Sequence, residues 1–535
     1  MTGAAPAEAG AADARARPPL FSILVPLFDT PEIYIRELVA SVRAQTFGDW
    51  QLVLVDDGSA ARHVRDVLAE LASGDPRIVV DHLPANAGIV AASARALGLA
   101  SGEWVAFVDH DDELVPAALA RCAEVVADPL VDFVYTDEDR RTPDADVPLR
   151  KPDWSPERLR SQMYTSHLAV MRRSLVVKVG GFRPGFDGSQ DYDLALRVSE
   201  AARRIVHIPE VLYHWRLVAQ SVGQVGRPEV FAAARRALED HLVRRSIAGH
   251  VEQVHPTGVY RTGRKVVGHP LVSFVIPTRG SVGEVGGRRR VFVTELMRGL
   301  AERTSWARWE AVVVADTSTP ASAIEELRDV AGDRLTLVPF DEPFNFARKI
   351  NRGALAASGE HLVLLNDDME VVTPDWVETM LALSQQPDVG MVGPLLSFED
   401  GSIQHAGLMF RWMTPGNIGH GEDAGEAGPM FGYGVQREAS GVTGACCMMP
   451  AAVFHEVGGM SEQFAVNYND VDLCFKVRGS GRRILWTPYA HLRHFESRSR
   501  VGGVGASEIH LILSRWGRLY DREDPYWPLE APLRP

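Results

Sequence analysis

Short, continuous apolar runs alternate along the chain with segments whose apolar residues recur at helical spacing. The runs SILVP (22–26) and QLVLVDD (51–57) end in Pro or Asp, and IRELVASVRAQ (35–45) lies between them. Continuous apolar runs of this kind are typical of strands that are buried on both faces of a parallel sheet. The order strand, helix, strand predicts an α/β, doubly wound domain whose ligands bind beyond the carboxyl ends of the strands.

The same pattern occurs twice. PLFSILVPLFD (19–29) returns as PLVSFVIPTRG (270–280), and DWQLVLVDDGS (49–59) returns as RWEAVVVADTS (308–318). Three further pairs of blocks follow in the same order: ASGEWVAFVDHDDEL with ASGEHLVLLNDDMEV, VGGF with VGGM, and QDYDLALRV with NDVDLCFKV. A period of roughly 250 residues predicts two copies of one domain and not a solenoid of short units.

The repeat also sets the expected domain boundaries. We expect one domain over 20–216, a second over 270–500 and a partly helical connector over 217–269, because AAARRALEDHLVRRS has a helical pattern and flexible linker composition is absent. Residues 1–19 are expected to form a disordered tail, and 501–535 a C-terminal extension. The amphipathic segment HLILSRWGRLY (510–520) is expected to pack onto the second domain, with docking at a membrane or a partner as the alternative.

Composition narrows the class of protein. Lys+Arg 56 against Asp+Glu 70 gives a net charge of −14, which argues against sequence-independent binding to nucleic acid. No apolar run reaches the roughly 18 residues of a membrane-spanning helix, and the first residues lack the apolar core of a signal peptide. The 4 cysteines form no C-x-x-C pair, which favours a reduced, cytoplasmic compartment, with the inner face of the cell membrane as a further possible place of work.

Acidic residues follow the same strand in both copies. Asp109 and Asp111 stand in VDHDDEL, and Asp367 and Asp368 stand in LNDDMEV. Carboxylates at this spacing bind a hard divalent cation that also takes phosphate oxygens from a substrate. The alternative is a helix N-cap, because a helical pattern follows. Recurrence at matched positions favours the metal interpretation.

Three further residue pairs recur at matched positions. Asp57 and Asp316, at strand ends, suit the N–H of a uracil or thymine ring or the hydroxyls of ribose, with an Asx-turn as the alternative. Asp191 and Asp470 each open a helical pattern and suit a general base for a hydroxyl nucleophile, with an N-cap as the alternative. His214 and His494 follow these aspartates by similar distances and suit a phosphate contact or a third metal ligand, although a lone histidine is usually structural. P-loop, G-x-G-x-x-G, G-x-S-x-G and H-E-x-x-H motifs are absent.

Several longer blocks resemble glycosyltransferase family 2, the inverting GT-A enzymes, and in particular tandem two-domain members that build cell-surface polysaccharides such as O-antigen or rhamnan. The blocks are VDHDDEL, YTDED (135–139), KPDWSPE (151–157) and SQDYDLALR (189–197) in the first copy, and FNFARKIN (344–351), VTGACCM (442–448), NDVDLCFK (469–476) and HFESRSR (494–500) in the second. The resemblance covers nearly the whole chain and implies two tandem GT-A domains, each with a Rossmann-like, mostly parallel central sheet.

The resemblance also implies roles for particular residues. It implies a nucleotide pocket in each copy, a divalent cation (Mn²⁺ or Mg²⁺) at the acidic motifs with the late histidine nearby, and a base that deprotonates the acceptor hydroxyl; more weakly, it implies acceptor contacts after KPDW. The residues are, for the nucleotide, Pro26, Phe28, Asp57, Pro277, Arg279 and Asp316; for the cation, Asp109, Asp111, Asp367, Asp368, His214 and His494; for the base, Asp191 and Asp470; and for the acceptor, Tyr164 and His167.

The second copy departs from the family pattern in two places. Asn366 stands where the first copy has Asp109, and Ala315 replaces the first aspartate of the VDDGS block. In both copies the acidic residue common before the base is an amide, Gln190 or Asn469. These departures leave the nucleotide choice of the second domain open.

The sequence therefore predicts a bifunctional, metal-dependent hexosyltransferase. Its partners are a nucleoside-diphosphate sugar donor and a glycan or lipid-linked glycan acceptor, with peripheral membrane contact as an open alternative. One rival is a chain with one catalytic domain and one non-catalytic glycan-binding or assembly domain. The other is a glycoside hydrolase, which uses a pair of carboxylates and needs no nucleotide.

Overall fold

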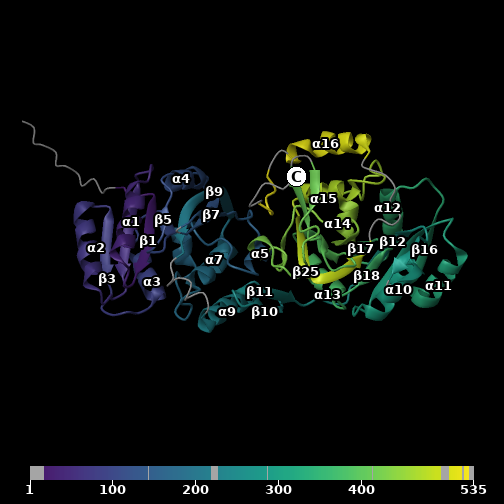
Figure 1. Cartoon of the computed structure of the whole chain (residues 1–535), viewed down its shortest axis with the longest axis horizontal. Coiled ribbons are helices and arrows are strands. Elements are labelled where there is room, and N and C mark those ends of the chain that lie inside the picture. The colour runs from purple at the N-terminus through teal and green to yellow at the C-terminus, as the bar shows by residue number, and fades with distance from the viewer. Residues whose placement is uncertain are drawn as a thin grey trace, which may run out of the picture. The chain divides into compact units, whose positions relative to one another are not determined.

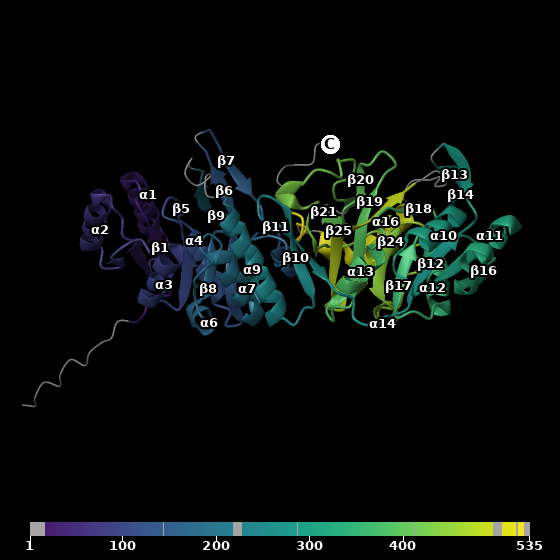
Figure 2. The same ribbon diagram turned by 90° about the horizontal axis from the view of Figure 1, so that it is seen from below.

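The computed structural model describes residues 17–142, 144–217, 227–285, 287–411, 414–495, 505–520 and 523–528. The chain divides into two compact units, which Figures 1 and 2 colour from purple to teal and from teal to yellow. The first unit comprises Met1–Leu149 with Thr165–Ala233, and the second comprises Arg150–Tyr164 with Ala234–Pro535. Each unit contains its own large sheet.

The sheet of the first unit has the strand order β3-β2-β1-β4-β8-β6-β9-β5, with β7 beside β6. The strands are β1 (Phe21–Leu27), β2 (Trp50–Asp56), β3 (Ile78–His82), β4 (Trp104–Phe107), β5 (Glu113–Leu114), β6 (Val131–Arg141), β7 (Asp146–Leu149), β8 (Ala169–Arg172) and β9 (Arg204–Arg216). The helices are α1 (Glu32–Arg43), α2 (Arg62–Gly74), α3 (Ile89–Leu99), α4 (Ala118–Val126), α6 (Arg173–Lys178) and α7 (Gln190–Ala201).

The sheet of the second unit has the order β16-β15-β12-β17-β24-β19-β25-β18, with β20 beside β19 and β23 beside β25. The strands are β12 (Val272–Thr278), β15 (Trp309–Asp316), β16 (Leu335–Phe340), β17 (His361–Leu365), β18 (Met369–Val371), β19 (Val389–Ser397), β20 (Ile403–His405), β23 (Arg437–Glu438), β24 (Cys446–Pro450) and β25 (Arg483–His494). The helices are α10 (Phe292–Arg303), α11 (Ala321–Ala331), α12 (Phe346–Ala356), α13 (Trp376–Ser384), α14 (Ala451–Glu456) and α15 (Asn469–Gly479). Short hairpins are formed by β13 (Val282–Val285) with β14 (Arg288–Val291) and by β21 (Leu408–Arg411) with β22 (Thr414–Asn417).

The two strand orders match position for position, so the duplication read from the sequence is confirmed as two α/β domains of GT-A type. The sheets are parallel over β3-β2-β1-β4 and over β16-β15-β12-β17. Beyond β4 and β17 they become mixed, because β8 and β24 run antiparallel to their neighbours. Further along, β6 pairs in parallel with β9 and β19 with β25. Among the described strands of the two sheets, only β8, β24 and the short strands β5, β7, β18, β20 and β23 therefore run the other way, and the expectation of a mostly parallel sheet is confirmed.

The buried side of α1 and two close glycine–serine contacts show how the sequence pattern determines the packing. On α1 the buried residues Ile35, Leu38, Val39 and Val42 recur at helical spacing and face the core that covers β1 and β2. In both copies the ASGE block brings a glycine N–H 2.8 Å from a serine hydroxyl of the first strand, Gly102 to Ser22 and Gly359 to Ser273. A Cβ at either glycine would lie within 2.6 Å of that serine, so both positions require glycine.

The segment Arg150–Tyr164, expected within the first domain, belongs to the second unit. Its short helix α5 (Pro156–Leu159) places Glu157, which is 1% exposed, 2.7 Å from Arg160 and 2.9 Å from Arg264. The adjacent Ser155 hydroxyl donates to Glu438, which also contacts Arg483. This buried ionic cluster joins residues that the sequence keeps far apart.

The expected connector contains one helix, α9 (Pro228–Arg244), followed by a hairpin of β10 (Gly249–His255) and β11 (Val259–Arg264) that the sequence pattern did not predict. Within the C-terminal extension, α16 (Ala506–Tyr520) packs on the second unit through Ile512 and Trp516, as expected. The predicted N-terminal tail falls almost entirely outside the described residues. Among the residues that the structure describes, no helix is both long enough and apolar enough to cross a membrane.

Candidate functional sites

In the first unit, three predicted site residues follow neighbouring parallel strands. Phe28 follows β1, Asp57 follows β2 and Asp109 comes shortly after β4, and these strands lie side by side in the order β2-β1-β4. The carboxyl ends of parallel strands meet at one edge of a sheet, which is where ligands bind in open α/β folds. Phe28 is 44% exposed, while Pro26 is half-buried. Residues predicted from separate motifs thus share one sheet edge.

Asp57 is buried and already holds two hydrogen bonds. Its two carboxylate oxygens accept the backbone N–H groups of Ala87 at 2.8 Å and Gly88 at 2.9 Å. These residues directly precede α3, so the carboxylate fixes the loop that leads into this helix. Each carboxylate oxygen has a further lone pair, so these bonds leave the group able to accept from a ligand.

The aspartates of VDHDDEL divide into two kinds. Asp112 is 1% exposed and accepts the Tyr213 hydroxyl at 2.6 Å and the Arg216 N–H at 2.8 Å. Burial, reinforced by the charge of Asp109, raises the pKa of Asp112 well above its usual range. The Tyr213 oxygen also accepts the Asp109 N–H at 3.1 Å. Asp112 and Tyr213 together therefore fix the backbone of the VDHDDEL motif. The side chain of Asp109, in contrast, is 48% exposed.

His167 and Asp191 both interact electrostatically with Asp109. The His167 Nε2 lies 3.5 Å from the Asp109 carboxylate, and its ring stacks on Tyr213 with centroids 4.7 Å apart. Burial opposes protonation of His167, but the hydrogen bond and charge of Asp109, with Glu138 and Asp112, raise its pKa to about 9. Burial raises the pKa of Asp191, and the charge of Asp109 adds to this effect while His167 opposes it. The predicted base thus stands close to the predicted cation site.

His214 lies in a different group of residues. Its Nδ1 lies 2.9 Å from both carboxylate oxygens of Asp139. One ligand atom from each of His214, Asp139 and Asp146 falls within 4.8 Å of the others, although Asp146 also pairs with Arg141. Asp139 belongs to the YTDED block, but no role was predicted for it. The prediction that His214 serves the Asp109 motif remains untested.

The second unit repeats this edge with one substantial difference. Asp316, at the end of β15, forms a 2.6 Å ion pair with Lys349 of α12, and the same Nζ donates to the Thr278 carbonyl at 3.1 Å. Lys349 is 1% exposed and sits above the rings of Phe340 and Phe344. Asp316 is therefore neutralised by a side chain, where Asp57 is held by backbone N–H groups. The sequence presented Lys349 within FNFARKIN but gave no sign of its partner.

The NDD motif of the second unit meets His494 directly. The His494 Nε2 lies 3.1 Å from the Asp368 carboxylate, while its Nδ1 lies 2.6 Å from the side-chain amide oxygen (Oε1) of Gln404. Asp367 accepts the Thr278 hydroxyl at 2.6 Å, and burial with the charge of Asp368 raises its pKa to about 7. The exposed Arg279 acts in the opposite direction on Asp367, so it lies within electrostatic range of the motif, whereas Pro277 is buried.

The two predicted bases occupy equivalent positions. Asp191 is the second residue of α7 and Asp470 the second residue of α15, so neither is the N-cap that the alternative interpretation required. Asp470 accepts the Gly444 N–H at 3.0 Å, and the next residue, Ala445, accepts the Asn366 N–H at 2.8 Å. Base and acidic motif thus contact adjacent residues of one loop.

The aspartates two residues later are structural in both copies. Asp193 is fully buried between Arg183 and Arg197, and Asp472 between Lys476 and Arg515. Tyr164, predicted at the acceptor, belongs to the second unit, is 2% exposed, and accepts the Ser155 N–H with its hydroxyl at 2.8 Å. His167 lies in the first unit, so the two residues predicted at one acceptor site fall in different units.

The donor atoms of both acidic motifs suit a divalent cation. In the first unit Asp109 and Asp111 offer carboxylate oxygens, the hard ligands that Mg²⁺ and Mn²⁺ prefer. In the second, Asn366 offers a buried amide oxygen that has no hydrogen-bond partner among the described residues, beside Asp368 and His494. A cation would satisfy this oxygen. With a cation bound, this amide would compensate in part for the missing first aspartate.

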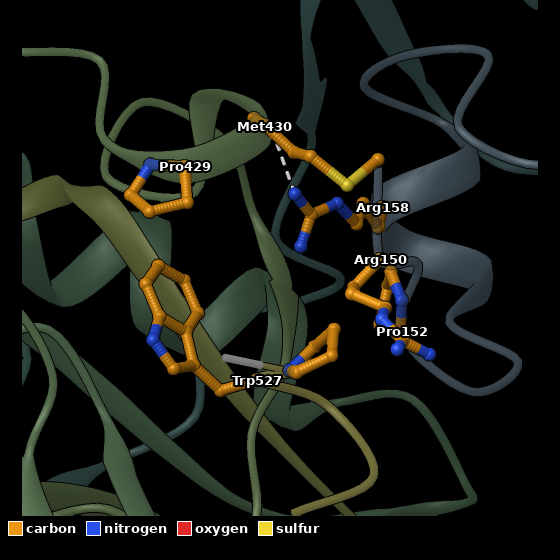
Figure 3. A pocket seen from close by; sticks show the side chains of 7 residues that line it. Arg150, Pro152, Arg158, Pro429, Met430 and Trp527 are labelled. Atoms are coloured by element: carbon orange, nitrogen blue, oxygen red, sulfur yellow. Dashed lines mark hydrogen bonds between the residues drawn. The ribbon is translucent and has the colours of Figure 1, made fainter. Parts of the chain in front are cut away.

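A separate hollow of roughly 220 Å³, including space open to solvent, lies elsewhere in the second unit (Figure 3). Its lining is formed by Arg150, Pro152, Arg158, Pro429, Met430, Trp527 and Pro528. Arg158 closes one side by donating to the Met430 carbonyl at 2.7 Å. None of the predicted donor or base residues lines this hollow, so we assign it no part in the reaction.

Comparison with known families agrees with this geometry. The family model described as glycosyl transferase family 2 matches residues 22–180 and 273–456, one match in each copy. These two matches cover more than half of the 535 residues. The chain belongs to glycosyl transferase family 2.

Individual relatives carry the similarity across both copies. The chain is 37% identical over 493 residues to the O-antigen biosynthesis protein RfbC of Myxococcus xanthus, covering 90% of this chain and 38% of that protein. It is 38% identical over 497 residues to the uncharacterized protein y4gI of Sinorhizobium fredii (strain NBRC 101917 / NGR234), covering 90% of this chain and 54% of that protein. The chain therefore spans about half or less of the length of these relatives.

Shorter and more distant similarities also exist. The hyaluronan synthase of Pasteurella multocida is 30% identical over 203 residues, which are 37% of this chain and 20% of that protein. The crystal structure of S. aureus TarS 1–349 in complex with UDP is 22% identical, with a TM-score of 0.35, covering 42% of this chain and 65% of that chain.

Proposed function

We propose that the chain carries two glycosyltransferase sites, each of which transfers a hexosyl unit from a nucleoside-diphosphate sugar to a glycan or lipid-linked glycan and inverts the anomeric centre. The observation that supports this proposal most strongly is the repetition of one arrangement. In each unit an aspartate at the second position of a helix, Asp191 or Asp470, is tied to the acidic motif, through charge in the first unit and through one loop in the second.

The chemistry requires little beyond these groups. Asp191 and Asp470 would each accept the proton of the acceptor hydroxyl, whose oxygen forms the new bond at the anomeric carbon while the bond to the diphosphate breaks. Because attack comes from the side opposite the leaving group, one base suffices and the anomeric configuration inverts. A cation held by Asp109 and Asp111, or by Asp367 and Asp368, would stabilise the charge that develops on the diphosphate.

The nucleotide would lie at the end of β1 and β2, and at the end of β12 and β15. Phe28 offers an exposed ring for stacking on a base, and Asp57 retains acceptor capacity. In the second unit the exposed Arg279 would bring positive charge to the diphosphate or base. Since Lys349 already neutralises Asp316, we propose that the two units prefer different nucleotides.

The acceptor and the place of work are also part of the proposal. The similarity to a protein named for O-antigen biosynthesis supports a cell-envelope glycan as acceptor. We propose that the reaction takes place in the cytoplasm, where nucleotide sugars are made, and at the inner face of the membrane if the acceptor is lipid-linked. The alternative, in which the second unit only binds glycan, draws on the Lys349–Asp316 pair and on Asn366.

A transfer assay tests the reaction class. With Mn²⁺, a glycan primer and a panel of UDP-, TDP- and GDP-hexoses, we expect release of nucleoside diphosphate together with growth of the primer, and NMR of the product should show an inverted anomeric configuration. The control omits the nucleotide sugar and should show an unchanged glycan. Cleavage of the bare glycan in that control, without primer growth in the full reaction, would instead indicate a glycoside hydrolase.

A further inference from the structure

His214 and His494 are not equivalent in the structure, although the sequence places them at similar distances after the two bases. In the first unit His214 is opposite Glu113 on β5 and opposite Asp139 on β6. In the second unit the residue opposite Glu370 on β18 is Arg493, and His494 is opposite Met369. Because Glu113 and Glu370 hold the same place in the repeat, His214 matches Arg493.

The other neighbouring strand gives the same result. In the first unit Asp139 of β6 is opposite His214 of β9. In the second unit Ser397 of the equivalent strand β19 is opposite Arg493 of β25. Trp215 therefore takes the place of His494. A shift of one residue along a strand turns a side chain to the opposite face of the sheet. This explains why His214 contacts Asp139, whereas His494 contacts the acidic motif.

A second exchange compensates for the first. Arg172 on β8 is opposite Trp104, and Pro450 on β24 is opposite the matching His361, so Arg172 and Pro450 are equivalent. His167 precedes Arg172 by as many residues as Ala445 precedes Pro450, so His167 and Ala445 hold equivalent positions. One unit thus has a histidine before β8 and a tryptophan on β9, and the other has an alanine before β24 and a histidine on β25.

The two imidazoles present the same face to the acidic motif. His167 directs Nε2 toward Asp109 at 3.5 Å and Nδ1 toward the buried Glu138 carboxylate at 3.7 Å. His494 directs Nε2 toward Asp368 at 3.1 Å and Nδ1 toward the side-chain amide oxygen of Gln404 at 2.6 Å. An oxygen near one ring nitrogen orients the imidazole so that its other nitrogen can bind a metal or an anion. Both rings are largely buried, with side chains 21% and 9% exposed.

We infer that His167, and not His214, is the imidazole of the first unit's cation–diphosphate site, supplied from the segment before β8, whereas the second unit supplies its imidazole from β25. This inference rests on the proposed function, because it assigns a residue within that donor site. His214 then belongs to the ionic group of Asp139 and Asp146 on the other face of β9.

Manganese binding to matched variants of the full chain tests the assignment. His167→Phe keeps a ring that stacks on Tyr213 and removes both ring nitrogens, and His214→Phe is its matched control. Electron paramagnetic resonance of Mn²⁺, titrated in the presence of a mixture of UDP, TDP and GDP, counts the sites without requiring turnover. We expect two sites in the wild type, a loss of affinity of about 10- to 100-fold at one of them in His167→Phe, and two unchanged sites in His214→Phe. Circular dichroism establishes that each variant is folded, and His167→Gln replaces His167→Phe if the latter does not fold.

The outcomes separate this inference from the proposed function. Wild-type protein that binds Mn²⁺ at two sites, together with an unchanged His167 variant or a weakened His214 variant, overturns the histidine assignment alone. Folded wild-type protein that binds no Mn²⁺ with any of the three diphosphates overturns the metal-dependent donor site and, with it, the role of His167.

Discussion

Asp191→Asn is expected to abolish one glycosidic linkage and leave the other, and Asp470→Asn to do the reverse. An amide cannot accept the proton of the acceptor hydroxyl, so each variant should lose about 10³-fold in the rate of its own transfer step, within the usual range for loss of a general base. NMR linkage analysis of the products assigns the missing bond. Binding of the nucleoside diphosphate should remain, because neither aspartate belongs to the proposed nucleotide pocket.

The two single variants serve as controls for each other, since a general loss of folding would affect both linkages. The N–H contacts of both side chains, with Tyr192 and with Gly444, involve carboxylate oxygens, one of which the amide retains. If the double variant elongates the acceptor at the wild-type rate, the assignment of these aspartates as bases is wrong.

Glu157→Gln is expected to cost about 3 kcal/mol of unfolding free energy at pH 7. Burial alone would raise the pKa of Glu157, but the charges of Arg264, Arg160 and Arg483 outweigh it and lower the pKa to about 2 from an ordinary value of 4.5. This difference corresponds to about 3 kcal/mol in favour of the ionised form. Gln has the shape of the protonated acid and no charge, so it forms no ion pairs with the arginines and loses this contribution.

The sign of the pH dependence follows from the lowered pKa. The contribution of Glu157 is fully present above pH 4.5 and is lost as the pH falls from 4.5 towards 2, because the unfolded chain then binds a proton that the folded state resists. Urea unfolding at several pH values should therefore show the variant and the wild type converging below pH 4.5. Glu70→Gln, which removes an ion pair with Arg36 whose glutamate is 63% exposed, should leave the unfolding free energy nearly unchanged at any pH. Equal losses in the two variants would contradict a buried, stabilising cluster around Glu157.

The repeat and the strand pattern predicted the fold because both depend on local, periodic features. Runs such as SILVP and VSFVIP are apolar because β1 and β12 are buried on both faces. The acidic motifs follow equivalent strands, β4 and β17, in the two copies. The positions of the two bases at the second residue of α7 and α15 also follow from the matched blocks.

The equivalence of the two histidines and the partners of the buried charges were not predicted correctly from the sequence. His214 follows Asp191 by 23 residues and His494 follows Asp470 by 24, so the residue at the matching distance is Arg493 and not His494. One residue along a strand exchanges the two faces of the sheet, so this small difference places the two histidines on opposite faces. The partners of Glu157 and Lys349 are distant in sequence, and their ion pairs depend on the folded chain.

Calorimetric titration of the full chain with UDP, TDP and GDP, each with and without Mn²⁺, tests the central claim of two donor sites most directly. We predict metal-dependent binding at two sites per chain. The two sites should differ in the nucleotide they bind, because Asp316 forms an ion pair with Lys349 whereas the equivalent Asp57 accepts backbone N–H groups. A single site would contradict the bifunctional assignment and leave one copy as a binding or structural domain. Absence of binding by all three diphosphates, with the protein shown to be folded, would contradict the transferase sites altogether.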